Sequence, residues 1–340
     1  MTMTYSTLLP LAAMERKHLE QSGALSLSIV VPVFNESESI PVFLKAISKA
    51  LCIKLPFPIE IVFINDGSTD NTVEVLLNEQ SPSENCTIKI LDLSRNFGKE
   101  AAMTAGLHAS TGQMIVPMDV DLQDPPELIL EMVKKWQEGY DVVLCRRSNR
   151  DSDHWFKRFT ANLFYKLHNK ISEPVIPDNV GDFRLMDRVV VDALSQLEES
   201  RRFMKGLFSW AGFRTTTVDY IRQKRVAGES KFNGWRLWNF ALEGVTSFSI
   251  APLVIWTYAG FTISIFSVSY GLIILVRSLI FGIDVPGYAS LLVTMTFLGG
   301  IQLMGIGILG EYLGRTYLES KRRPIYLIRK IYQVGAKQSL

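Results

Sequence analysis

The sequence predicts an α/β domain with a mostly parallel sheet and helices on both faces, followed by a hairpin of two transmembrane helices. Two observations lead to this prediction. From residue 26 onward, short runs rich in β-branched residues alternate with amphipathic stretches, the pattern of parallel strands joined by crossover helices. Further along, 33 positions at 244–276 and 26 positions at 285–310 carry no charge. Each run exceeds the roughly 20 apolar residues that a bilayer-crossing helix requires.

Five strands of the domain follow from these runs, each with a helix after it. They are predicted at residues 27–34, 59–65, 88–93, 114–118 and 141–145. Because ligands bind beyond the carboxyl ends of strands in open sheets of this kind, we expect the functional residues in the turns that follow them.

Residues 151–232 have a more mixed pattern, and we expect them to carry acceptor specificity. A helix is predicted at 155–169, a loop rich in Pro and Asp at 174–181, and another helix from about Asp187. At 233–246, Trp235, Trp238 and Leu242 share helical spacing, which suits a helix at the membrane surface. A plain packing helix is the alternative.

The two uncharged runs predict a membrane hairpin because the segment between them is short. Buried core helices are the alternative, but such helices seldom run so far without a charge or cap. The connecting turn holds one basic residue, Arg277, whereas seven follow Glu311: Arg315, Lys321, Arg322, Arg323, Arg329, Lys330 and Lys337. The positive-inside bias therefore puts both the N-terminal domain and the tail in the cytoplasm, on a multi-pass protein of the cytoplasmic membrane.

The predicted organisation has five parts. They are an N-terminal extension at 1–25 without a signal peptide, a catalytic domain at 26–232, an interfacial amphipathic helix at 233–246, two transmembrane helices at 247–310 and a basic cytoplasmic tail at 311–340.

The stretch MDVDLQDPPE, at 118–127, directly follows a predicted buried strand. Asp119 and Asp121 would repel each other without a cation, and hard oxygen ligands of this kind suit Mg²⁺ or Mn²⁺ on a diphosphate. Gln123 adds a neutral third oxygen. The alternative is helix capping before Pro125; we assign that role to Asp124 and metal binding to Asp119 and Asp121.

Two further turns offer polar groups at neighbouring strand ends. In VPVFNE, Asn35 and Glu36 are placed to hydrogen-bond a base or ribose; in NDGSTD, Asp66 precedes Gly67, which lets the chain bend. Each turn alone could be ordinary turn chemistry, but three on successive strands of one sheet indicate a binding site.

Six motifs in order resemble the family 2 glycosyltransferases of the GT-A fold. They are VPVFNE, NDGSTD, RNFGKEAAMTAG, DVDLQDPPE, GDFRLMDR and GESKF. Within that family the chain is similar to polyprenyl-phosphate glycosyltransferases, which include dolichyl-phosphate mannose synthase and the bactoprenol glucosyltransferases. The likeness runs from residue 26 to about 330 and includes GEYLGR at 310–315 and RRPIY at 322–326. Asn65 departs from it, since the family often has an acid there.

The resemblance implies a role for each matching position. Pro32, Asn35, Glu36 and Asp66 would cradle a uridine-type nucleotide, with Asp119 beside it. Asp119, Asp121 and Gln123 would hold Mg²⁺ or Mn²⁺ on the diphosphate. Asp121 would also be a catalytic residue. Asp182 matches an acid proposed as base in the bactoprenol glucosyltransferases. Arg184 and Lys231 match basic positions near phosphates.

The acceptor expected from this resemblance is a lipid phosphate, which hardly needs a strong base because a phosphate monoester is already largely ionised near neutral pH. Asp182 therefore either orients the acceptor or completes its deprotonation. Arg184, Lys231, Arg146 and Arg147 would gather the anionic acceptor, although the last two also suit an ordinary solvated strand end.

Composition and missing motifs exclude several other classes. A net charge of +2 argues against a general nucleic-acid binder. The sequence has no GxGxxG after a strand, no GxxxxGK[ST] and no GxSxG, and its four histidines lack metal-ligand spacing. Three widely spaced cysteines, Cys52, Cys86 and Cys145, indicate neither a disulfide framework nor a zinc site and suit a reduced cytosol.

Two rival functions remain to be weighed. Processive polysaccharide synthases share the fold but resemble one another in a QxxRW motif that is not found here. A noncatalytic membrane scaffold or flippase partner has no use for the paired acids Asp119 and Asp121. The donor is expected to be UDP-glucose, because GDFRLMDR resembles the glucosyltransferases; N-acetylglucosamine, galactose and mannose donors are the alternatives. Gly299, Gly300, Gly305 and Gly307 permit a homo-oligomer or close packing within the hairpin.

Overall fold

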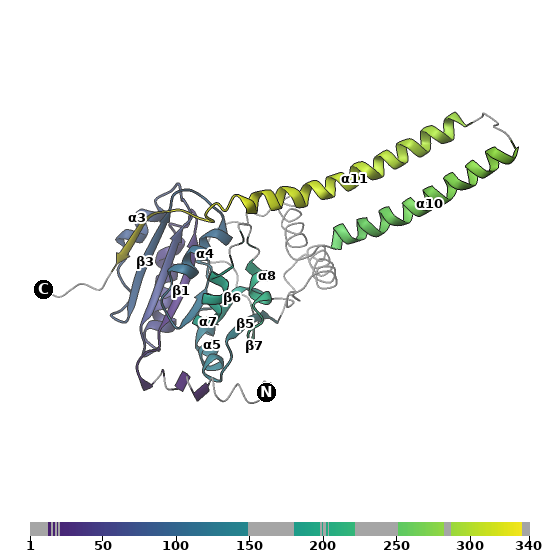
Figure 1. Cartoon of the computed structure of the whole chain (residues 1–340). Helices are drawn as coiled ribbons and strands as arrows, with labels where there is room; N and C mark the ends of the chain where they lie inside the picture. The colour runs from purple at the N-terminus through teal and green to yellow at the C-terminus, as the bar shows by residue number, and fades with distance from the viewer. Residues whose placement is uncertain are drawn as a thin grey trace.

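The computed structural model describes residues 13–14, 16–17, 19, 21–148, 180–197, 199, 202, 204–221, 251–281 and 287–334 (Figure 1). Within these residues the chain forms one eight-stranded mixed sheet, in the order β7-β5-β6-β4-β1-β2-β3-β8. Its strands are β1 (Leu27–Val33), β2 (Ile59–Asn65), β3 (Cys86–Leu93), β4 (Met114–Pro117), β5 (Val142–Arg147), β6 (Val180–Asp187), β7 (Thr215–Tyr220) and β8 (Ile328–Val334).

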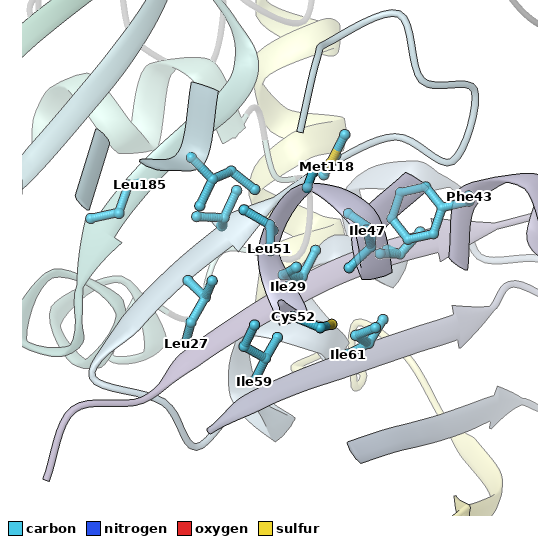
Figure 2. Close-up of a cluster of buried hydrophobic side chains, with 14 of the residues drawn as sticks. Leu27, Ile29, Phe43, Ile47, Leu51, Cys52, Ile59, Ile61, Met118 and Leu185 are labelled. Carbon is cyan, nitrogen blue, oxygen red and sulfur yellow. The ribbon is translucent and has the colours of Figure 1, made fainter. Parts of the chain in front are cut away.

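The central strands are apolar on both sides because helices cover both faces of the sheet. Along β1, Ile29 and Val31 belong to one buried cluster and Val30 to the other. The first cluster lies under α2 (Ser39–Ile47), the π-helical turn η1 (Ser48–Cys52), α3 (Thr72–Asn78) and α5 (Leu128–Gln137) (Figure 2). The second lies under α4 (Lys99–Ala109), α7 (Arg188–Ser195) and α8 (Met204–Trp210).

The five strands expected from the sequence are all confirmed, with ends that differ by at most two residues. The helix expected near Asp187 is α7, whose first turn Asp187 caps by accepting a hydrogen bond from the Val189 N–H. Strands β6 and β7 were not predicted. The predicted helix at 155–169, most of the loop at 174–181, the GESKF motif and the interfacial helix at 233–246 lie outside the described residues.

Strand β8 is the largest departure from the predicted organisation. Residues 311–340 were expected to form a basic tail, but 311–320 continue a helix and 328–334 pair antiparallel with β3 at the edge of the sheet. The Ser94 N–H donates to the Leu327 carbonyl at 2.9 Å, and Arg329 Nη2 donates to the Ser94 carbonyl at 2.9 Å. Residues 328–334 are therefore part of the same sheet as the N-terminal strands.

Two long helices, α10 (Ala251–Phe281) and α11 (Tyr288–Ser320), project away from the sheet and run alongside each other (Figure 1). In the described residues one segment, Phe297–Ser320, is long and apolar enough to cross a membrane. The helices approach closely at Gly305, where an added Cβ would lie 2.1 Å from Trp256 Nε1. Gly305 therefore packs α11 on α10, whereas Gly299, Gly300 and Gly307 have open space around them.

The expectation about the cysteines was wrong for one pair. Cys52 and Cys86 form a disulfide, and only Cys145 is free among the described cysteines. The end of η1 lies over the start of β3, which brings together two residues 34 positions apart in the sequence. The spacing of the cysteines in the sequence does not predict a contact over this separation.

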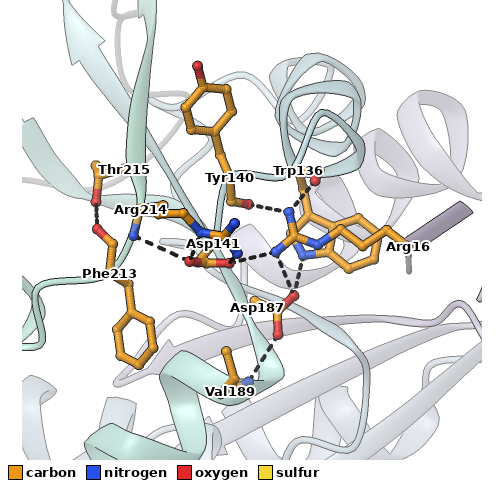
Figure 3. A network of polar contacts seen from close by, with 9 residues as sticks. All are labelled: Arg16, Trp136, Tyr140, Asp141, Asp187, Val189, Phe213, Arg214 and Thr215. Atoms are coloured by element: carbon orange, nitrogen blue, oxygen red, sulfur yellow. Dashed lines mark hydrogen bonds and ion pairs between the residues drawn. The ribbon is translucent and has the colours of Figure 1, made fainter. Parts of the chain in front are cut away.

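The N-terminal segment is tied to the domain through Arg16, a buried residue (Figure 3). Its guanidinium donates to Asp141 Oδ1 at 2.7 Å, to Asp187 Oδ2 at 3.2 Å and to the main-chain carbonyls of Trp136 and Tyr140. It also stacks over the Trp136 ring, 4.6 Å from the centroid. The predicted N-terminal extension thus contributes a buried cation to the domain.

Candidate active site

The predicted site residues gather at one edge of the sheet, where parallel strands β1, β2 and β4 end. Strand β6 runs antiparallel to β4, with Ile115 opposite Met186. Continued four residues further, that register brings Asp119 opposite Asp182, so the start of β6 reaches the same edge. The topology therefore joins the acidic turn after β4 to a motif more than 60 residues later in the sequence.

The turns after β1 and β2 are bound to each other. Asn35 has a left-handed backbone (φ 56°), its N–H donates to Ser68 Oγ at 3.0 Å, and its Oδ1 accepts from the Thr69 N–H at 2.9 Å. The Glu36 N–H donates to Thr72 Oγ1 at 3.0 Å, while Pro32 lies within β1. These contacts hold the two turns in register at the edge; nucleotide contacts by Pro32, Asn35 and Glu36 stay predictions.

Asp66 fixes the next loop rather than facing open solvent. It is 3% exposed; its Oδ1 accepts from the Phe97 N–H at 2.7 Å and its Oδ2 from the Gly98 N–H at 2.9 Å. Burial raises its pKa, with the two amides and Arg95 opposing that shift. Asp66 therefore positions the start of α4, and its expected contact with the nucleotide stays a prediction.

Asn65, the departure from the family pattern, has a physical partner. Its Nδ2 donates to Asp92 Oδ1 at 2.7 Å, and its Oδ1 accepts from the Ser68 N–H at 3.2 Å. Both side chains are buried. An acid at position 65 would face the Asp92 carboxylate directly, so an amide is the residue that fits here.

Gly67 is required by a close approach of two loops. It has φ 66°, and an added Cβ would lie 2.4 Å from the main-chain carbon of Arg95. The turn after β2 and the loop after β3 are thereby packed backbone to backbone, which fixes the loop that leads into α4.

The acidic turn after β4 contains a strained residue. Leu122 adopts φ 54°, a conformation that costs a non-glycine residue about 1–2 kcal/mol. The Asp121 Oδ1 accepts from the Gln123 N–H at 3.2 Å across this turn. Gln123 Oε1 is buried and, among the described residues, has no hydrogen-bond partner.

This turn fits a divalent cation with oxygen ligands. A buried amide oxygen without a partner is costly unless something else binds it, and two carboxylates lie beside it in the sequence. Gln123 would be the third ligand from the chain, beside Asp119 and Asp121. The described residues contain no group of three or more His, Cys, Asp or Glu suited to a metal.

Lys99 joins the two acids that the topology brings together. Its Nζ lies 2.6 Å from Asp119 Oδ1, 2.9 Å from Asp119 Oδ2 and 3.1 Å from Asp182 Oδ2. Although partial burial opposes it, the charges of Asp182 and Asp119 raise the pKa of Lys99. Lys99 therefore stays protonated and bridges the two acids in the middle of the candidate site.

Asp182 is held ionised. Burial acts against the charge, but Lys99, Lys205 and Arg184 together lower the pKa of Asp182 to about 2. A carboxylate with so low a pKa is a weak proton acceptor. The charges around Asp182 therefore favour an orienting role over a role as general base.

Arg184 braces the segment that carries Asp182. Only 4% exposed, it donates to the carbonyls of Gly181 (2.7 Å) and Asp182 (3.3 Å) and stacks on Phe208, 4.0 Å from the centroid. Burial lowers its pKa to about 10, with Asp182 opposing. Contact between Arg184 and an acceptor phosphate stays a prediction.

Glu100, next to Lys99, links α4 to α8. Its Oε2 accepts from the Met204 N–H at 3.3 Å. Burial, followed by the charge of Asp182, raises the pKa of Glu100 to about 7, although Lys99 acts in the opposite direction. The site thus contains one acid held ionised and one that titrates near neutrality.

The other basic residues expected at the site are placed differently. Arg146 forms a two-point pair with Asp219, at 2.7 and 2.9 Å, and Arg147 Nε donates to the Tyr220 hydroxyl at 3.3 Å. Lys231 lies outside the described residues. Phosphate binding by Arg146 and Lys231 stays a prediction.

Lys99 and Glu100 are the residues that sequence reasoning missed. The RNFGKEAAMTAG motif was noticed, but no residue in it received a role. The available signal was a lysine directly after a glycine, at the start of a helix that follows a strand end. Gly98, with φ 97°, makes that turn possible.

Comparisons with known proteins agree with the fold and the motifs. The model of glycosyl transferase family 2 matches residues 28–195. The bactoprenol glucosyl transferase of Shigella phage SfV is 54% identical over 305 residues, which cover 90% of this chain and 98% of that protein. The prophage bactoprenol glucosyl transferase homolog of Escherichia coli K12 is 53% identical over 307 residues, covering 90% and 99%.

Among solved structures, mannosyl-3-phosphoglycerate synthase from Rubrobacter xylanophilus matches with 19% identity and a TM-score of 0.46, covering 68% of this chain and 74% of that one. Identity above 50% across nearly the whole length of the bactoprenol enzymes is the stronger finding. The chain therefore belongs to glycosyl transferase family 2 and is a glycosyltransferase.

Proposed function

We propose that the protein transfers glucose from UDP-glucose to a polyprenyl phosphate at the cytoplasmic face of a membrane, with Mg²⁺ or Mn²⁺ as cofactor. The observation that carries this proposal is the Asp119–Lys99–Asp182 cluster at the carboxyl edge of the sheet. Beside it lies an acidic turn whose buried amide oxygen has no hydrogen-bond partner among the described residues. Relatives named bactoprenol glucosyl transferase match along nearly their whole length, which supports the lipid phosphate as acceptor.

The donor's nucleotide is assigned to the turns after β1 and β2. Asn35 and Thr69 lock these turns together, and Asp66 holds the loop before α4 against them. A preformed pair of turns lowers the cost of ordering the site when a ligand binds.

The donor's diphosphate is assigned to the turn after β4. Asp119, Asp121 and Gln123 would hold the cation, which stabilises the negative charge that develops on the leaving diphosphate. Leu122 in its left-handed conformation sets the direction of the residues on either side of it. Asp119 also contacts Lys99, whose Nζ contacts Asp182 as well.

The acceptor's phosphate is assigned to the side of Asp182. Because the pKa of Asp182 is about 2 and a phosphate monoester is largely ionised at neutral pH, Asp182 orients the acceptor and its surroundings more than it removes a proton. The acceptor oxygen attacks the sugar carbon as the bond to the diphosphate breaks, and this step needs no proton transfer from a dianionic phosphate.

Helices α10 and α11 are assigned to the membrane as a two-span hairpin, with the catalytic domain in the cytoplasm. Phe297–Ser320 meets the length and composition of a span, and the charge-free run at 244–276 supports the second. Lys321, Arg322 and Arg323 directly follow α11, which suits the cytoplasmic side and anionic headgroups.

A transfer assay tests the proposal. Purified protein in detergent, with radiolabelled UDP-glucose, a polyprenyl phosphate and Mg²⁺, should give a labelled lipid that requires the cation. Asp119→Ala and Asp121→Ala should remove the activity, and equal transfer by both variants would rule the mechanism out. Parallel reactions with UDP-N-acetylglucosamine, UDP-galactose and GDP-mannose identify the donor.

A further inference from the structure

The position of Lys99 raises a question that the proposed function leaves open. Its Nζ makes contacts of 2.6 to 3.1 Å with Asp119 and Asp182, and its side chain is 44% exposed. An ammonium group has three donors, and these contacts occupy them. Lys99 therefore binds Asp119, a carboxylate that is also proposed to bind the cofactor cation.

Two cations on one carboxylate repel each other strongly in a partly buried site. A divalent cation on Asp119 would therefore weaken the pairing of Lys99 with Asp119, whereas Asp182 can keep Lys99 throughout. Once Lys99 releases Asp119, two of its N–H donors become available between the donor side and the acceptor side of the site.

The acceptor side needs a cation of this kind. A phosphate that approaches Asp182 meets a carboxylate whose low pKa keeps it charged. Arg184 is buried and donates to main-chain carbonyls, and Arg146 is paired with Asp219. Lys99 is partly exposed and already lies 3.1 Å from Asp182.

The position of Lys99 is also well determined. Asp66 accepts hydrogen bonds from the N–H groups of Phe97 and Gly98, the two residues that precede Lys99. Because the turn after β2 thus fixes the start of α4, movement of Lys99 between partners is restricted to its flexible side chain.

We propose that Lys99 exchanges partners during the reaction cycle: it holds Asp119 before the donor binds, and it binds a phosphate oxygen of the acceptor, together with Asp182, once Asp119 takes the cation. The inference rests on the proposed function and adds a residue that contacts the acceptor. Lys99 would then weaken binding of the metal, with which it competes for Asp119, and strengthen binding of the acceptor.

The test is Lys99→Met, which keeps the length of the side chain and removes its charge. The KM for a polyprenyl phosphate should rise about 10- to 100-fold, the loss expected for one charge-assisted hydrogen bond. The Kd of UDP in the presence of Mn²⁺, measured by calorimetry, should stay the same or decrease, because a competitor for Asp119 is gone. Lys99→Arg should recover most of the acceptor affinity.

Lys135→Met is the matched control, because Lys135 pairs with Glu138 on an exposed helix face away from the site; it should change neither constant. A parallel weakening of Mn²⁺–UDP binding and of acceptor affinity in Lys99→Met would mean that Lys99 is a structural brace, and unchanged constants would mean that it has no role; either result overturns the inference. The calorimetric measurement does not require enzyme turnover. If the wild-type protein transfers no sugar, the proposed function is therefore rejected independently of the Mn²⁺–UDP binding result.

Discussion

Asn65→Asp is the substitution that tests the geometry at the end of β2 most directly. The change is isosteric and restores the acid that the family often has at this position. It also places a second carboxylate where the amide Nδ2 now lies 2.7 Å from Asp92 Oδ1, with residue 65 only 1% exposed and Asp92 4% exposed. Arg329, at 3.5 Å from Asp92 Oδ2, is the nearest compensating charge and is itself 62% exposed.

The cost can be worked out from these contacts. A hydrogen bond to a charged group, worth about 1.5–3 kcal/mol, is lost. Two carboxylates in contact cannot both ionise, so the pair must take up a proton. We expect a loss of about 2–4 kcal/mol in the free energy of unfolding near neutral pH, or about 5–15 °C in apparent melting temperature.

The stability difference between Asn65→Asp and wild type should depend on pH. The folded variant binds a proton that the unfolded chain has released, so its deficit relative to wild type grows as pH rises above about 4 and shrinks on acidification. Thermal unfolding in detergent at several pH values measures this. The Asn65→Asp/Asp92→Asn double variant restores one amide and one acid and should recover most of the loss. A melting temperature for Asn65→Asp equal to wild type at every pH would refute the reasoning.

Three further outcomes follow from the cluster and from the N-terminal segment. Asp182, with a pKa of about 2, stays ionised over roughly pH 5.5 to 8, so the ratio of wild-type to Asp182→Asn transfer rates should be constant across that range; a ratio that collapses near neutrality would make Asp182 a titrating base. The folded pKa of Glu100 is about 7, above its unfolded value of 4.5, so the wild type loses stability as pH rises from about 4.5 to about 7 and loses no more above that. Glu100→Gln should therefore gain melting temperature relative to wild type as pH rises from about 5 to about 7, with the gain levelling off at higher pH; a difference that does not vary with pH would contradict this. Arg16→Met should lower the free energy of unfolding by about 2–4 kcal/mol, because buried acids lose a partner, although Asp141 keeps Arg214. Arg146→Met, which breaks an exposed pair, should leave the free energy of unfolding nearly unchanged and serves as its control; similar losses in both would show that burial does not decide the cost.

The parts of the fold that could be predicted are those with local signals. Strands β1 to β5 are short runs, apolar for most of their length and followed within two positions by Asn, Asp or Ser, and each was placed to within two residues. Strand β8 has the sequence IRKIYQV, where charge obscures the alternation, and its partner β3 lies about 240 positions earlier. Nothing near β8 in the chain indicates that pairing, and the Cys52–Cys86 contact escaped prediction for the same reason.

In the candidate site, too, the residues with local sequence signals could be predicted and the long-range contacts could not. Asp119, Asp121 and Gln123 stand within five residues of one another, so their chemistry could be inferred from the sequence. The cation that joins Asp119 to Asp182 comes from a different loop, and only the antiparallel register of β4 and β6 shows that the two acids meet. A resemblance named Asp182 without indicating what surrounds it or how strongly Lys99 keeps it charged.

The position of β8 has a consequence for biosynthesis and for protein engineering. Strand β3 obtains its outer neighbour from residues that are synthesised after both long helices. A fragment truncated before α10 would leave the edge of β3 open to pairing with other chains, a known route to aggregation. A water-soluble version should therefore retain residues 321–334, joined by a linker that replaces the helices.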